Sequence, residues 1–399
     1  MNIRYLLKSI KHFFPIQLKK DEYDIIFYYP SHFNRGNNSE NAFFAPFYEL
    51  CNRYGIKYAV FEEPELFKKT SRNPETVPFD FPFMTILILR KLIPLKSFDS
   101  FQHREWFIAK ILKPLFRRYN FKNYIVLSNS MLGFFRGLNP NAKLFDYQHG
   151  VIFSSHTGYF TENGEAPPHI KENGVNLLLY GSGFRDLLVK KSRDNYYENH
   201  TFVLGIGEST KKPQKIKALK NITFSLQFTG TGEFADKQSD WVQIIREFYE
   251  KYEQFFLEHD LKILMKHHPR FDGSINVSPI IGFPFAELFD GSLDEALDRS
   301  FLHLTFYSTS IFDASVKGIP TLLWNHKYSL ANIFREDFGY PVPVCSDPAR
   351  LIDKISIYLT GSEALEKDGE KVFEWYKKIY SPLDKELFLS LFTNGKVKK

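Results

Sequence analysis

Short apolar runs with strand character alternate with amphipathic helical stretches along almost the whole chain of 399 residues. Alternation of this kind is typical of parallel, doubly wound sheets with helices on both faces. Helical stretches such as 41–54 and 184–191 separate the runs of the first half. The runs that we expect to form strands there are 23–29, 57–61, 124–127, 143–147, 176–180 and 201–204. The sequence therefore predicts an α/β fold built on a largely parallel sheet.

One segment interrupts this alternation. Residues 205–221 hold two glycines, a proline and five lysines with almost no apolar side chain, which predicts an exposed linker. Strands are expected to resume at 222–228, 262–265, 301–306 and 320–324, with helices at 239–258, 293–299, 311–317, 348–359 and 363–379. Because the chain is too long for one ordinary core, we expect two Rossmann-like domains facing a central cleft. They are residues 1–207 and 222–380, joined by the linker 208–221, with a C-terminal helix in 381–399 packing back on the first domain.

The composition is typical of a globular protein from a reducing compartment. Hydrophobic residues make up 43% of the chain and charged residues 25%, which is a normal balance. Cys51 and Cys345 lie far apart and have no metal-ligand spacing, so a disulfide framework is not expected. The first 20 residues lack the apolar core of a secretory signal, and the apolar run 83–89 is too short to span a bilayer. We expect a cytoplasmic protein, with a peripheral position at the inner face of the cell membrane as a further hypothesis.

The net charge of +6 is unevenly distributed. Residues 1–20 hold five basic side chains and no acid, and their apolar residues recur at helical spacing. Such a helix suits an anionic membrane surface. A second basic helix is expected at 102–118. The alternative for both is an ordinary packed helix with a solvated basic face. Nucleic acid is not an expected partner, because the sequence shows no recognised module and no dense basic stripe.

Two loops in the second half suit an anion through their backbone. In the first, glycines would let N–H groups approach a phosphate or a sugar closely; its residues are Gly230, Thr231 and Gly232. In the second, small hydroxyl residues open a helix, where free N–H groups can bind phosphate; they are Ser308, Thr309 and Ser310. A glycine-rich turn and a hydroxyl N-cap are both common after strands. Their order along the chain, each at a strand end, is what favours a binding site.

A third loop of the second half, Lys266–Arg270, is strongly basic. Pro269 restricts His268 to extended conformations and ends the strand. We expect Lys266, His268 and Arg270 to face one anion. An ordinary strand end with basic residues is the alternative, and a metal site is disfavoured because no nearby carboxylate completes a ligand set.

In the first half, the strand 144–147 leads into a glutamine, a histidine and a glycine. A hydroxyl that attacks as a nucleophile needs a base within hydrogen-bond reach, and histidine titrates in the useful range. His149 is the predicted base, and the neighbouring Gly150 leaves room for a substrate. A histidine satisfied by a backbone carbonyl is the alternative reading, and the competing bases are Asp146, His156 and Glu162.

A polar loop follows the first expected strand. Arg35 and Asn37 lie in it, between an apolar run and the helical stretch 41–54. In an open α/β sheet, loops at this end of the strands contact the ligand. We therefore expect Arg35 and Asn37 to bind the acceptor, that is, the substrate that carries the attacking hydroxyl. Hydrophilic loops before helices are common, so an ordinary loop is the alternative.

With these residues in view, the chain resembles bacterial glycosyltransferases of the GT-B fold that build capsules, lipopolysaccharide and other surface polysaccharides. The likeness covers most of the chain as a layout and is specific at Gln148–Gly150, His268–Pro269 and Ser308–Ser310. A His-Pro pair followed by a Ser/Thr cluster is similar to sialyltransferases, polysialyltransferases and Kdo transferases, which use CMP-sugars. The resemblance implies that His268 and the Ser/Thr cluster contact the donor phosphate.

The segment Gln148–Gly150 departs from that pattern, because those sialyltransferases carry an acidic motif for the base. It looks more like teichoic-acid glycerol- or ribitol-phosphate transferases, in which the histidine is the expected base. The resemblance therefore implies a CMP-sugar as the favoured donor, with a CDP-alditol or a UDP- or GDP-sugar as alternatives.

Together these features predict an inverting transfer of a sugar from a nucleotide-sugar to a glycan or lipid-linked glycan. No Asp-x-Asp motif is present, so we expect no metal and no cofactor besides the nucleotide-sugar co-substrate. Three alternatives remain open. They are a CDP-alditol phosphotransferase, a nucleotide-sugar epimerase, and a non-catalytic scaffold of glycan assembly.

Overall fold

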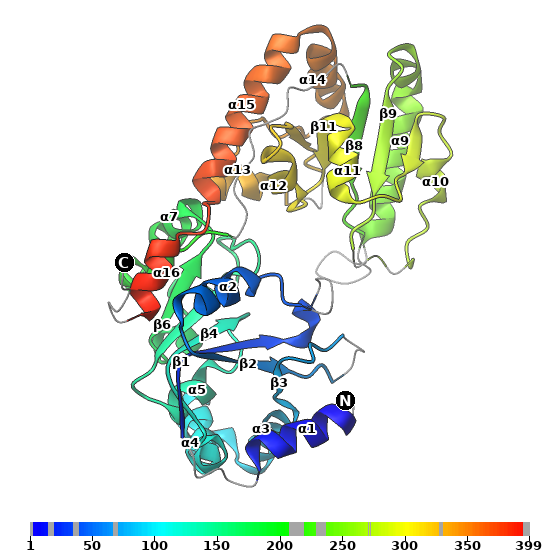
Figure 1. Cartoon of the computed structure of the whole chain (residues 1–399). Coiled ribbons are helices and arrows are strands. Elements are labelled where there is room, and N and C mark those ends of the chain that lie inside the picture. Colours follow the sequence, from blue (N-terminus) through cyan, green and yellow to red (C-terminus); the bar gives the residue numbers. More distant parts are fainter. Residues whose placement is uncertain are drawn as a thin grey trace. The chain divides into compact units, whose positions relative to one another are not determined.

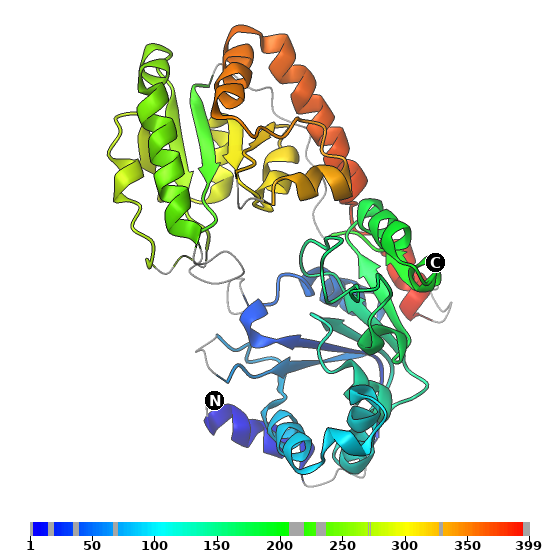
Figure 2. The ribbon, with the colours of Figure 1, turned by 180° about the vertical axis from the view of Figure 1, so that it is seen from behind.

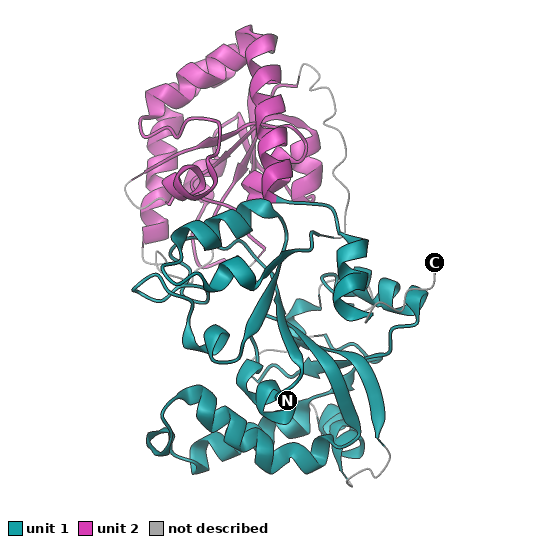
Figure 3. Ribbon diagram, turned by 90° about the vertical axis from the view of Figure 1, so that its left-hand side faces the viewer, with its two compact units in different colours: residues 1–209, 380–399 teal, residues 210–379 magenta. Residues whose placement is uncertain are grey.

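A computed structural model gives the arrangement of the chain. It describes residues 3–14, 20–34, 40–66, 71–206, 219–228, 237–269, 271, 273–326 and 330–393. The chain divides into two compact units, coloured separately in Figure 3. Unit 1 comprises Met1–Ser209 with Tyr380–Lys399, and unit 2 comprises Thr210–Ile379. The predicted linker lies outside the described residues as far as residue 218, and its last residue, Asn221, already belongs to a strand of unit 2.

Unit 1 is built on a seven-stranded sheet in which every neighbouring pair of strands is parallel. The order is β3-β2-β1-β4-β5-β6-β7, so the direction of winding reverses between β1 and β4 (Figure 1). The strands are β1 (Asp21–Pro30), β2 (Tyr58–Glu63), β3 (Val77–Pro78), β4 (Tyr119–Leu127), β5 (Lys143–Tyr147), β6 (Val175–Leu179) and β7 (Thr201–Val203).

Helices cover both faces of this sheet because side chains alternate along each strand. Tyr28 points to one face, where its ring lies 5.5 Å from Phe135 of α5. Phe27 and Tyr147 point to the other face and pack on Phe47 of α2. The helices of unit 1 are α1 (Ile3–Phe13), α2 (Ala45–Tyr54), α3 (Asp80–Leu92), α4 (Phe101–Leu112), α5 (Leu132–Leu138), α6 (Pro168–Lys171), α7 (Ser182–Lys191), α8 (Tyr196–Asn199) and α16 (Lys385–Phe392). Short 3-10 turns are η1 (Ser31–Phe33), η3 (Leu95–Ser97) and η4 (Lys113–Phe116).

α16, the last helix in the described part of the chain, belongs to unit 1. The chain returns with Ser381 N donating a hydrogen bond to Tyr180 O at 2.8 Å. The ring of Phe388 then lies 5.2 Å from Phe47. One turn later, the ring of Phe392 lies 5.1 Å from a phenylalanine of β5. Two aromatic side chains four residues apart therefore fix this helix against the sheet and α2.

Unit 2 repeats the same plan on a five-stranded parallel sheet of order β10-β9-β8-β11-β12. Its strands are β8 (Asn221–Ser225), β9 (Lys262–Lys266), β10 (Ala286–Leu288), β11 (Ser300–Thr305) and β12 (Thr321–Leu323). Its helices are α9 (Gln238–Glu258), α10 (Ser278–Ile281), α11 (Leu293–Asp298), α12 (Ser310–Ser315), α13 (Asn332–Phe338), α14 (Pro348–Thr360) and α15 (Ser362–Ile379). Figure 2 shows α9 and α15 as the two long helices of this unit.

Aromatic side chains fill the core of unit 2 on both sides of the sheet. Trp241 of α9 lies 5.3 Å from Phe306, which lies 5.2 Å from Trp324. Phe312 of α12 stacks on Trp375 of α15 at 5.1 Å. Such rings bury large apolar areas and account for much of the stability of a core.

Both units are built on parallel sheets with helices between the strands. The predicted α/β fold is therefore confirmed in both units.

The basic helix expected at 102–118 is divided in two. α4 ends at Leu112, and η4 continues from Lys113. Pro114 lacks an N–H and cannot continue the hydrogen-bond ladder of α4, which explains the break. Among the described residues, no helix combines the length and the apolar character needed to cross a bilayer.

Candidate functional site

The strand orders place the predicted motifs at equivalent positions of the two sheets. In each sheet the winding reverses beside the first strand, at β1 and β4 in unit 1 and at β8 and β11 in unit 2. Ligands of open α/β sheets bind at the carboxyl ends of the strands near such a reversal. His149 follows β5, His268 follows β9 and Ser308 follows β11. Each motif therefore lies at the expected ligand-binding edge of its own unit.

His149 stands in a turn that a buried glutamine holds from two sides. The Gln148 side chain accepts a hydrogen bond from Tyr180 N at 2.9 Å and donates one to Gly150 O at 2.7 Å. The half-buried His149 ring lies edge-on to Phe33, with the ring centroids 5.5 Å apart. A side chain added at Gly150 would meet no atom within 4 Å. Space for a substrate is therefore present at the residue next to His149, as a base for an external hydroxyl requires.

Asp146, the first competing base, is closed to substrate. It is 1% exposed, and its carboxylate accepts hydrogen bonds from Asn129 N at 2.9 Å and from Tyr159 Oη at 3.1 Å. Burial raises the pKa of this carboxyl to about 7, although both hydrogen bonds act to lower it. Asn129 belongs to a turn after β4 in which Ser128 and Met131 also have positive φ. The structure therefore shows Asp146 holding this strained turn.

The two other competitors are placed differently. His156 Nδ1 accepts a hydrogen bond from Gly158 N at 3.1 Å, and burial lowers the pKa of the ring. A neutral ring that accepts at Nδ1 carries its proton on Nε2, so Nε2 is a donor and cannot take another proton as the neutral form. Glu162 is exposed in a turn closed by a hydrogen bond from Gly164 N to Thr161 O. The role of His149 as the base stays a prediction.

Sequence motifs did not indicate a second histidine at this edge. His32 lies in η1, directly after β1, and its Nδ1 contacts a carboxylate oxygen of Glu65. A carboxylate on Nδ1 keeps the proton there and leaves Nε2 able to accept another, which is the arrangement of an imidazole base. The His32 ring also lies 4.3 Å from Phe33, which contacts His149 as well. The pair could not be found by spacing, because the pairing of β1 with β2 brings together residues 33 positions apart.

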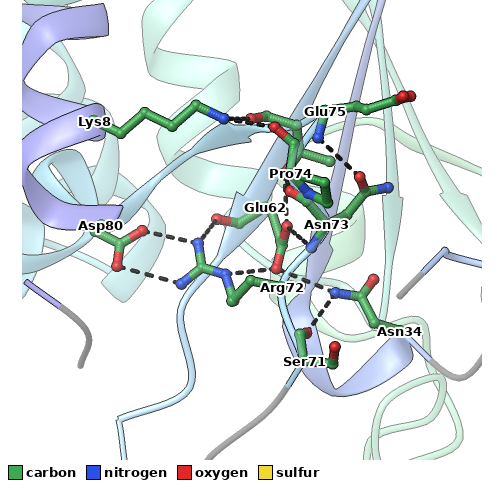
Figure 4. Close-up of polar contacts among 10 residues, drawn as sticks. Lys8, Asn34, Glu62, Ser71, Arg72, Asn73, Pro74, Glu75 and Asp80 are labelled. Carbon is green, nitrogen blue, oxygen red and sulfur yellow. Dashed lines mark hydrogen bonds and ion pairs between the residues drawn. The ribbon is translucent and has the colours of Figure 1, made fainter. Parts of the chain in front are cut away.

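A buried ion-pair network fixes the segment before α3 (Figure 4). Arg72 Nε lies 2.6 Å from Glu62 Oε1, and Arg72 Nη2 lies 2.9 Å from Asp80 Oδ2. Both carboxylates are fully buried. Thr76 Oγ1 donates a further hydrogen bond to Glu62 at 2.6 Å. Burial raises the pKa of Glu62 in spite of these partners. One guanidinium between two carboxylates satisfies charges that would be costly to bury alone.

The loop predicted to receive the acceptor starts at this network. Asn34 Nδ2 donates hydrogen bonds to Glu62 Oε1 at 3.2 Å and to Ser71 O at 2.8 Å (Figure 4). The network therefore anchors the residue that directly precedes the loop. Arg35 and Asn37 themselves lie outside the described residues, and their role in acceptor binding stays a prediction.

In unit 2, the His-Pro pair ends β9 with a tight turn. The His268 carbonyl accepts a hydrogen bond from Phe271 N at 2.9 Å, and Pro269 lies in a turn. His267 stacks on the Phe271 ring at 3.9 Å, and burial together with the neighbouring lysine lowers its pKa. His268 is half-buried. His267 is therefore engaged by an aromatic ring of its own unit.

Lys266 is the described member of a further set of predicted anion ligands in this unit. Lys266 Nζ donates a hydrogen bond to Phe289 O at 3.3 Å, just after β10. An ammonium has three N–H donors, so this one bond leaves donors for an anion. The residues outside the described part are Gly230, Thr231, Gly232 and Arg270.

The Ser/Thr cluster forms the turn between β11 and α12, but two of its hydroxyls face inward. Ser310 Oγ lies 3.2 Å from His303 Nε2, and Ser308 Oγ accepts a hydrogen bond from Ser310 N at 3.2 Å. Both serines are buried, whereas Thr309 is exposed. Buried hydroxyls need partners, and these two find them within unit 2. Of the three predicted phosphate ligands, Thr309 is the one whose side chain remains available.

A buried histidine organises this turn. His303 in β11 contacts Ser225 Oγ of β8 and Thr321 Oγ1 of β12, each at 2.9 Å. Burial lowers the pKa of His303 to about 3, so the ring is neutral. The imidazole thereby joins three strands and the start of α12. A histidine inside the apolar run 301–306 was the one signal in the sequence that could have indicated it.

Metal ligands do not cluster in the described part of the chain. No group of three or more His, Cys, Asp or Glu side chains there could hold a metal ion. Cys51 and Cys345 are buried free thiols. A metal-independent reaction stays a prediction.

Comparison with known proteins gives a likeness in structure alone. No protein-family model and no curated protein matches the sequence. A UDP-GlcNAc 2-epimerase from Neisseria meningitidis, solved with UDP-GlcNAc bound, has 10% identity and a TM-score of 0.53 over 94% of this chain and 100% of its own. The wall teichoic acid polymerase TagF has 11% identity and a TM-score of 0.48 over 99% and 97%. TarM has 13% identity and a TM-score of 0.43 over 74% of this chain and 58% of its own.

The chain has the GT-B fold. Two parallel sheets, each wound as a Rossmann-like unit, and the match to the epimerase along 94% of the chain establish this architecture. It is the fold that the sequence predicted. Because identity near 10% shows a shared fold and no more, the activity has to be argued from the side chains at the two strand edges.

Proposed function

We propose that the protein is a glycosyltransferase that moves a sugar from a nucleotide-activated donor to a surface glycan or lipid-linked glycan. The observation that carries this proposal is the presentation of His149. The His149 side chain is half-buried, and Gln148 ties the turn that carries it to Tyr180 N and Gly150 O. A side chain added at Gly150, the next residue, would meet no atom within 4 Å. The fold supports a nucleotide-sugar substrate, since a protein of the same architecture was solved with UDP-GlcNAc.

In the proposed reaction, His149 Nε2 accepts the proton of the acceptor hydroxyl while the hydroxyl oxygen attacks the anomeric carbon. The new C–O bond forms as the bond from the anomeric carbon to the donor phosphate oxygen breaks, and the nucleotide leaves with that electron pair. A single displacement inverts the anomeric configuration. A positioned base of this kind contributes roughly 10²–10⁴-fold to the rate.

Negative charge builds on the departing phosphate, and unit 2 offers groups to stabilise it. His268 is half-buried after β9, and Thr309 is exposed after β11. Charged and polar groups aimed at developing charge lower the barrier most when they are already in place. The buried contacts of His303 fix the Ser308–Ser310 turn in advance. CMP-sugars are the favoured donors, on the resemblance of the His-Pro pair and the Ser/Thr cluster.

The proposal is tested first by nucleotide binding. Thermal unfolding is followed with CMP, CDP, UDP, GDP and their common sugar conjugates, for the wild type and for His268→Ala. A ligand of the folded state raises the midpoint in proportion to ln(1 + [L]/Kd). We expect cytidine nucleotides to stabilise the wild type and to lose most of that effect in His268→Ala. Stabilisation by UDP or GDP alone would change the donor class, and no stabilisation by any of them would contradict the enzyme proposal.

Product analysis separates the sugar transfer from a CDP-alditol phosphotransfer, which the segment Gln148–Gly150 keeps in contention. Both reactions release CMP from a cytidine donor. Phosphorus enters the product in the phosphotransfer alone. The donor is therefore labelled with ³²P. If the label appears in the glycan product, the reaction is the phosphotransfer and the proposed sugar transfer is wrong.

An epimerase is the second candidate, and the match to the UDP-GlcNAc 2-epimerase favours it. Chemistry on the sugar of such a substrate requires acid and base groups that reach it. In unit 1, Glu62, Asp80 and Asp146 are at most 1% exposed and are bonded to other side chains, which argues against them. The test is incubation with UDP-GlcNAc and no acceptor. A 2-epimer detected by NMR would favour this candidate.

A further inference from the structure

Exposed apolar side chains gather on one part of unit 1. Among the described residues, fourteen large hydrophobic side chains are exposed, and nine of these lie in 3–14 or 88–111. Ile3 and Leu7 lie on α1, and Phe14 directly follows it. The six on α3, η3 and α4 are Ile88, Leu92, Leu95, Phe101, Phe107 and Ile111. We call these six the α3–α4 ridge. Exposed apolar clusters of this size mark interaction surfaces.

Four members of the ridge form pairs one helical turn apart. Ile88 and Leu92 are four residues apart on α3, and Phe107 and Ile111 are four apart on α4. The ring of Phe98 lies 5.5 Å from Phe107, and the Arg90 guanidinium of α3 lies 5.6 Å from the Phe101 ring of α4. These side chains form a stripe, while the opposite sides of α3 and α4 pack into unit 1.

α1 lies beside α3. Ser9 Oγ accepts a hydrogen bond from Phe81 N at 3.0 Å, and Lys8 Nζ donates one to Pro74 O at 2.7 Å. Phe13 is 1% exposed and contacts the Phe116 ring at 5.1 Å. α1 is thus a packed helix, which was the second of the two alternatives predicted from the sequence. Its outer apolar side chains lie next to the ridge. Figures 1 and 2 show α1, α3 and α4 at the same end of unit 1.

A cationic groove adjoins the ridge at the end of α4. Its volume is about 690 Å³, and its lining includes Lys20, Lys110, Lys113 and Arg117 but no acidic residue. Within the described part of the chain, none of these four forms an ion pair with a carboxylate. The groove also contacts Tyr119, where β4 begins, so it lies at the edge of the sheet opposite to His149.

The charge of this face is strongly positive. Residues 88–117 contain seven lysines and arginines and two acids. One of the acids, Glu105, is 2% exposed and is bound by Arg90 at 2.6 Å, which leaves Asp99 as the exposed one. Apolar side chains among unpaired cations favour the interface of an anionic bilayer, where the rings enter the headgroup region and the cations meet lipid phosphates. A protein partner of ordinary composition would bring acids or polar groups, and a second copy would set like charges against each other.

We propose that the α3–α4 ridge and the cationic groove dock unit 1 on an anionic bilayer. The ridge enters the interface, and the groove receives the phosphate of an anionic lipid headgroup. This places the membrane contact mainly on α3 and α4, with the outer stripe of α1 beside them. The inference does not depend on the proposed glycosyl transfer, since its test measures lipid binding and no turnover.

The experiment is co-sedimentation of the full chain with vesicles of phosphatidylcholine, with or without about 30 mol% phosphatidylglycerol. We expect the wild type to bind the anionic vesicles at least about tenfold more tightly than the neutral ones, with the difference shrinking at high salt. The ridge variant is Leu92→Asp with Ile111→Asp, and the groove variant is Lys110→Glu with Lys113→Glu. The ridge variant should lose roughly tenfold in affinity, and the groove variant should lose the preference for phosphatidylglycerol.

Matched controls change exposed side chains of unit 2. They are Leu257→Asp with Ile357→Asp, whose side chains are 51% and 48% exposed, and Lys251→Glu with Lys367→Glu. These should bind like the wild type, and circular dichroism should show the same fold in every variant. Absence of binding by the wild type, or equal losses in controls and test variants, would overturn the proposal. A dimer in light scattering that the ridge variant dissociates would assign the ridge to a second copy instead.

Discussion

Units 1 and 2 use buried polar side chains in opposite ways at equivalent ends of their sheets. In unit 1, the buried Gln148 side chain hydrogen-bonds to two backbone groups, Tyr180 N and Gly150 O, and the neighbouring His149 side chain is half-buried. In unit 2, His303 is buried and draws the Ser310 hydroxyl inward, which leaves Thr309 as the exposed member of the cluster. A motif therefore locates a site, while the hydrogen bonds beneath it decide which side chains face the ligand.

The largest effect is expected from the exposed histidine of unit 1. His149→Ala should lower the turnover number by roughly 10²–10⁴-fold, because it removes the base. Nucleotide-induced stabilisation should not change, since the predicted donor ligands belong to unit 2. Turnover and thermal shift are measured on the same preparations.

Two further histidines serve as comparisons. His156→Ala should retain activity, because its ring accepts a hydrogen bond from Gly158 N and cannot act as a base. His32→Gln tests the histidine–carboxylate pair. If His32→Gln abolishes turnover and His149→Ala does not, the role of base moves to the pair formed with Glu65.

Replacing the buried His303 of unit 2 should lower the stability of the protein, because this side chain holds the fold and is not predicted to take part in the reaction. His303→Ala leaves the hydroxyls of Ser225, Ser310 and Thr321 without their shared partner. Unsatisfied buried polar groups and the cavity should together lower the free energy of unfolding by about 3–4 kcal/mol. Urea unfolding measures the loss. A change below about 1 kcal/mol would mean that the imidazole does not organise the turn.

The same histidine gives a pH signature of defined sign. Its pKa in the folded state, about 3, lies below its ordinary value of 6.5. The unfolded chain therefore binds more protons between these values, and the stabilisation is complete above pH 6.5 and is lost as the pH falls toward 3. His303→Gln has no titratable ring, so the stability difference between wild type and variant should shift by a few kcal/mol over this range. A difference that stays constant would contradict the burial of a neutral imidazole.

A smaller effect is expected from Gln148, the glutamine that holds the turn of His149. Gln148→Ala leaves Tyr180 N and Gly150 O without their side-chain partners. We expect a loss of about 1–2 kcal/mol in unfolding free energy and about a tenfold fall in kcat with KM nearly unchanged, because the imidazole is less well held. A merely structural role would leave kcat per folded molecule intact. Gln148→Asn is too short to bridge both partners and should not restore activity.

Sequence reasoning predicted the fold well where strands are long and central. β5 forms at the predicted residues 143–147, and β4 contains the predicted run 124–127. The strands missing from the prediction are β3 and β10, two edge strands of two and three residues. Strands that pair on one side over so few residues show no period along the chain.

Site prediction was limited by contacts between distant residues. The position of His149 followed from a strand end and a neighbouring glycine, both of which are local signals. The contact of Ser225 with His303 joins residues 78 positions apart, and that of His32 with Glu65 joins residues 33 apart. Such pairs exist because parallel strands place their carboxyl ends side by side, and the sequence alone does not specify the register.

The smallest and sharpest effect compares two neighbours of one cluster, Thr309 and Ser310. Thr309→Ala removes an exposed hydroxyl and should weaken nucleotide binding by about fivefold, with the free energy of unfolding almost unchanged. Ser310→Ala removes a hydroxyl bound to His303 and should lower stability by about 1 kcal/mol with little effect on affinity. Isothermal titration with the nucleotide that gives the largest thermal shift, together with urea unfolding, measures both quantities for each variant. The two alanine variants serve as controls for each other, because the substituted residues are adjacent in the same turn.

If Ser310→Ala weakens binding while Thr309→Ala does not, the inward direction of the Ser310 hydroxyl is wrong for the bound state. In that case the turn must rearrange around the phosphate, and the hydrogen bond to His303 belongs to the free protein alone.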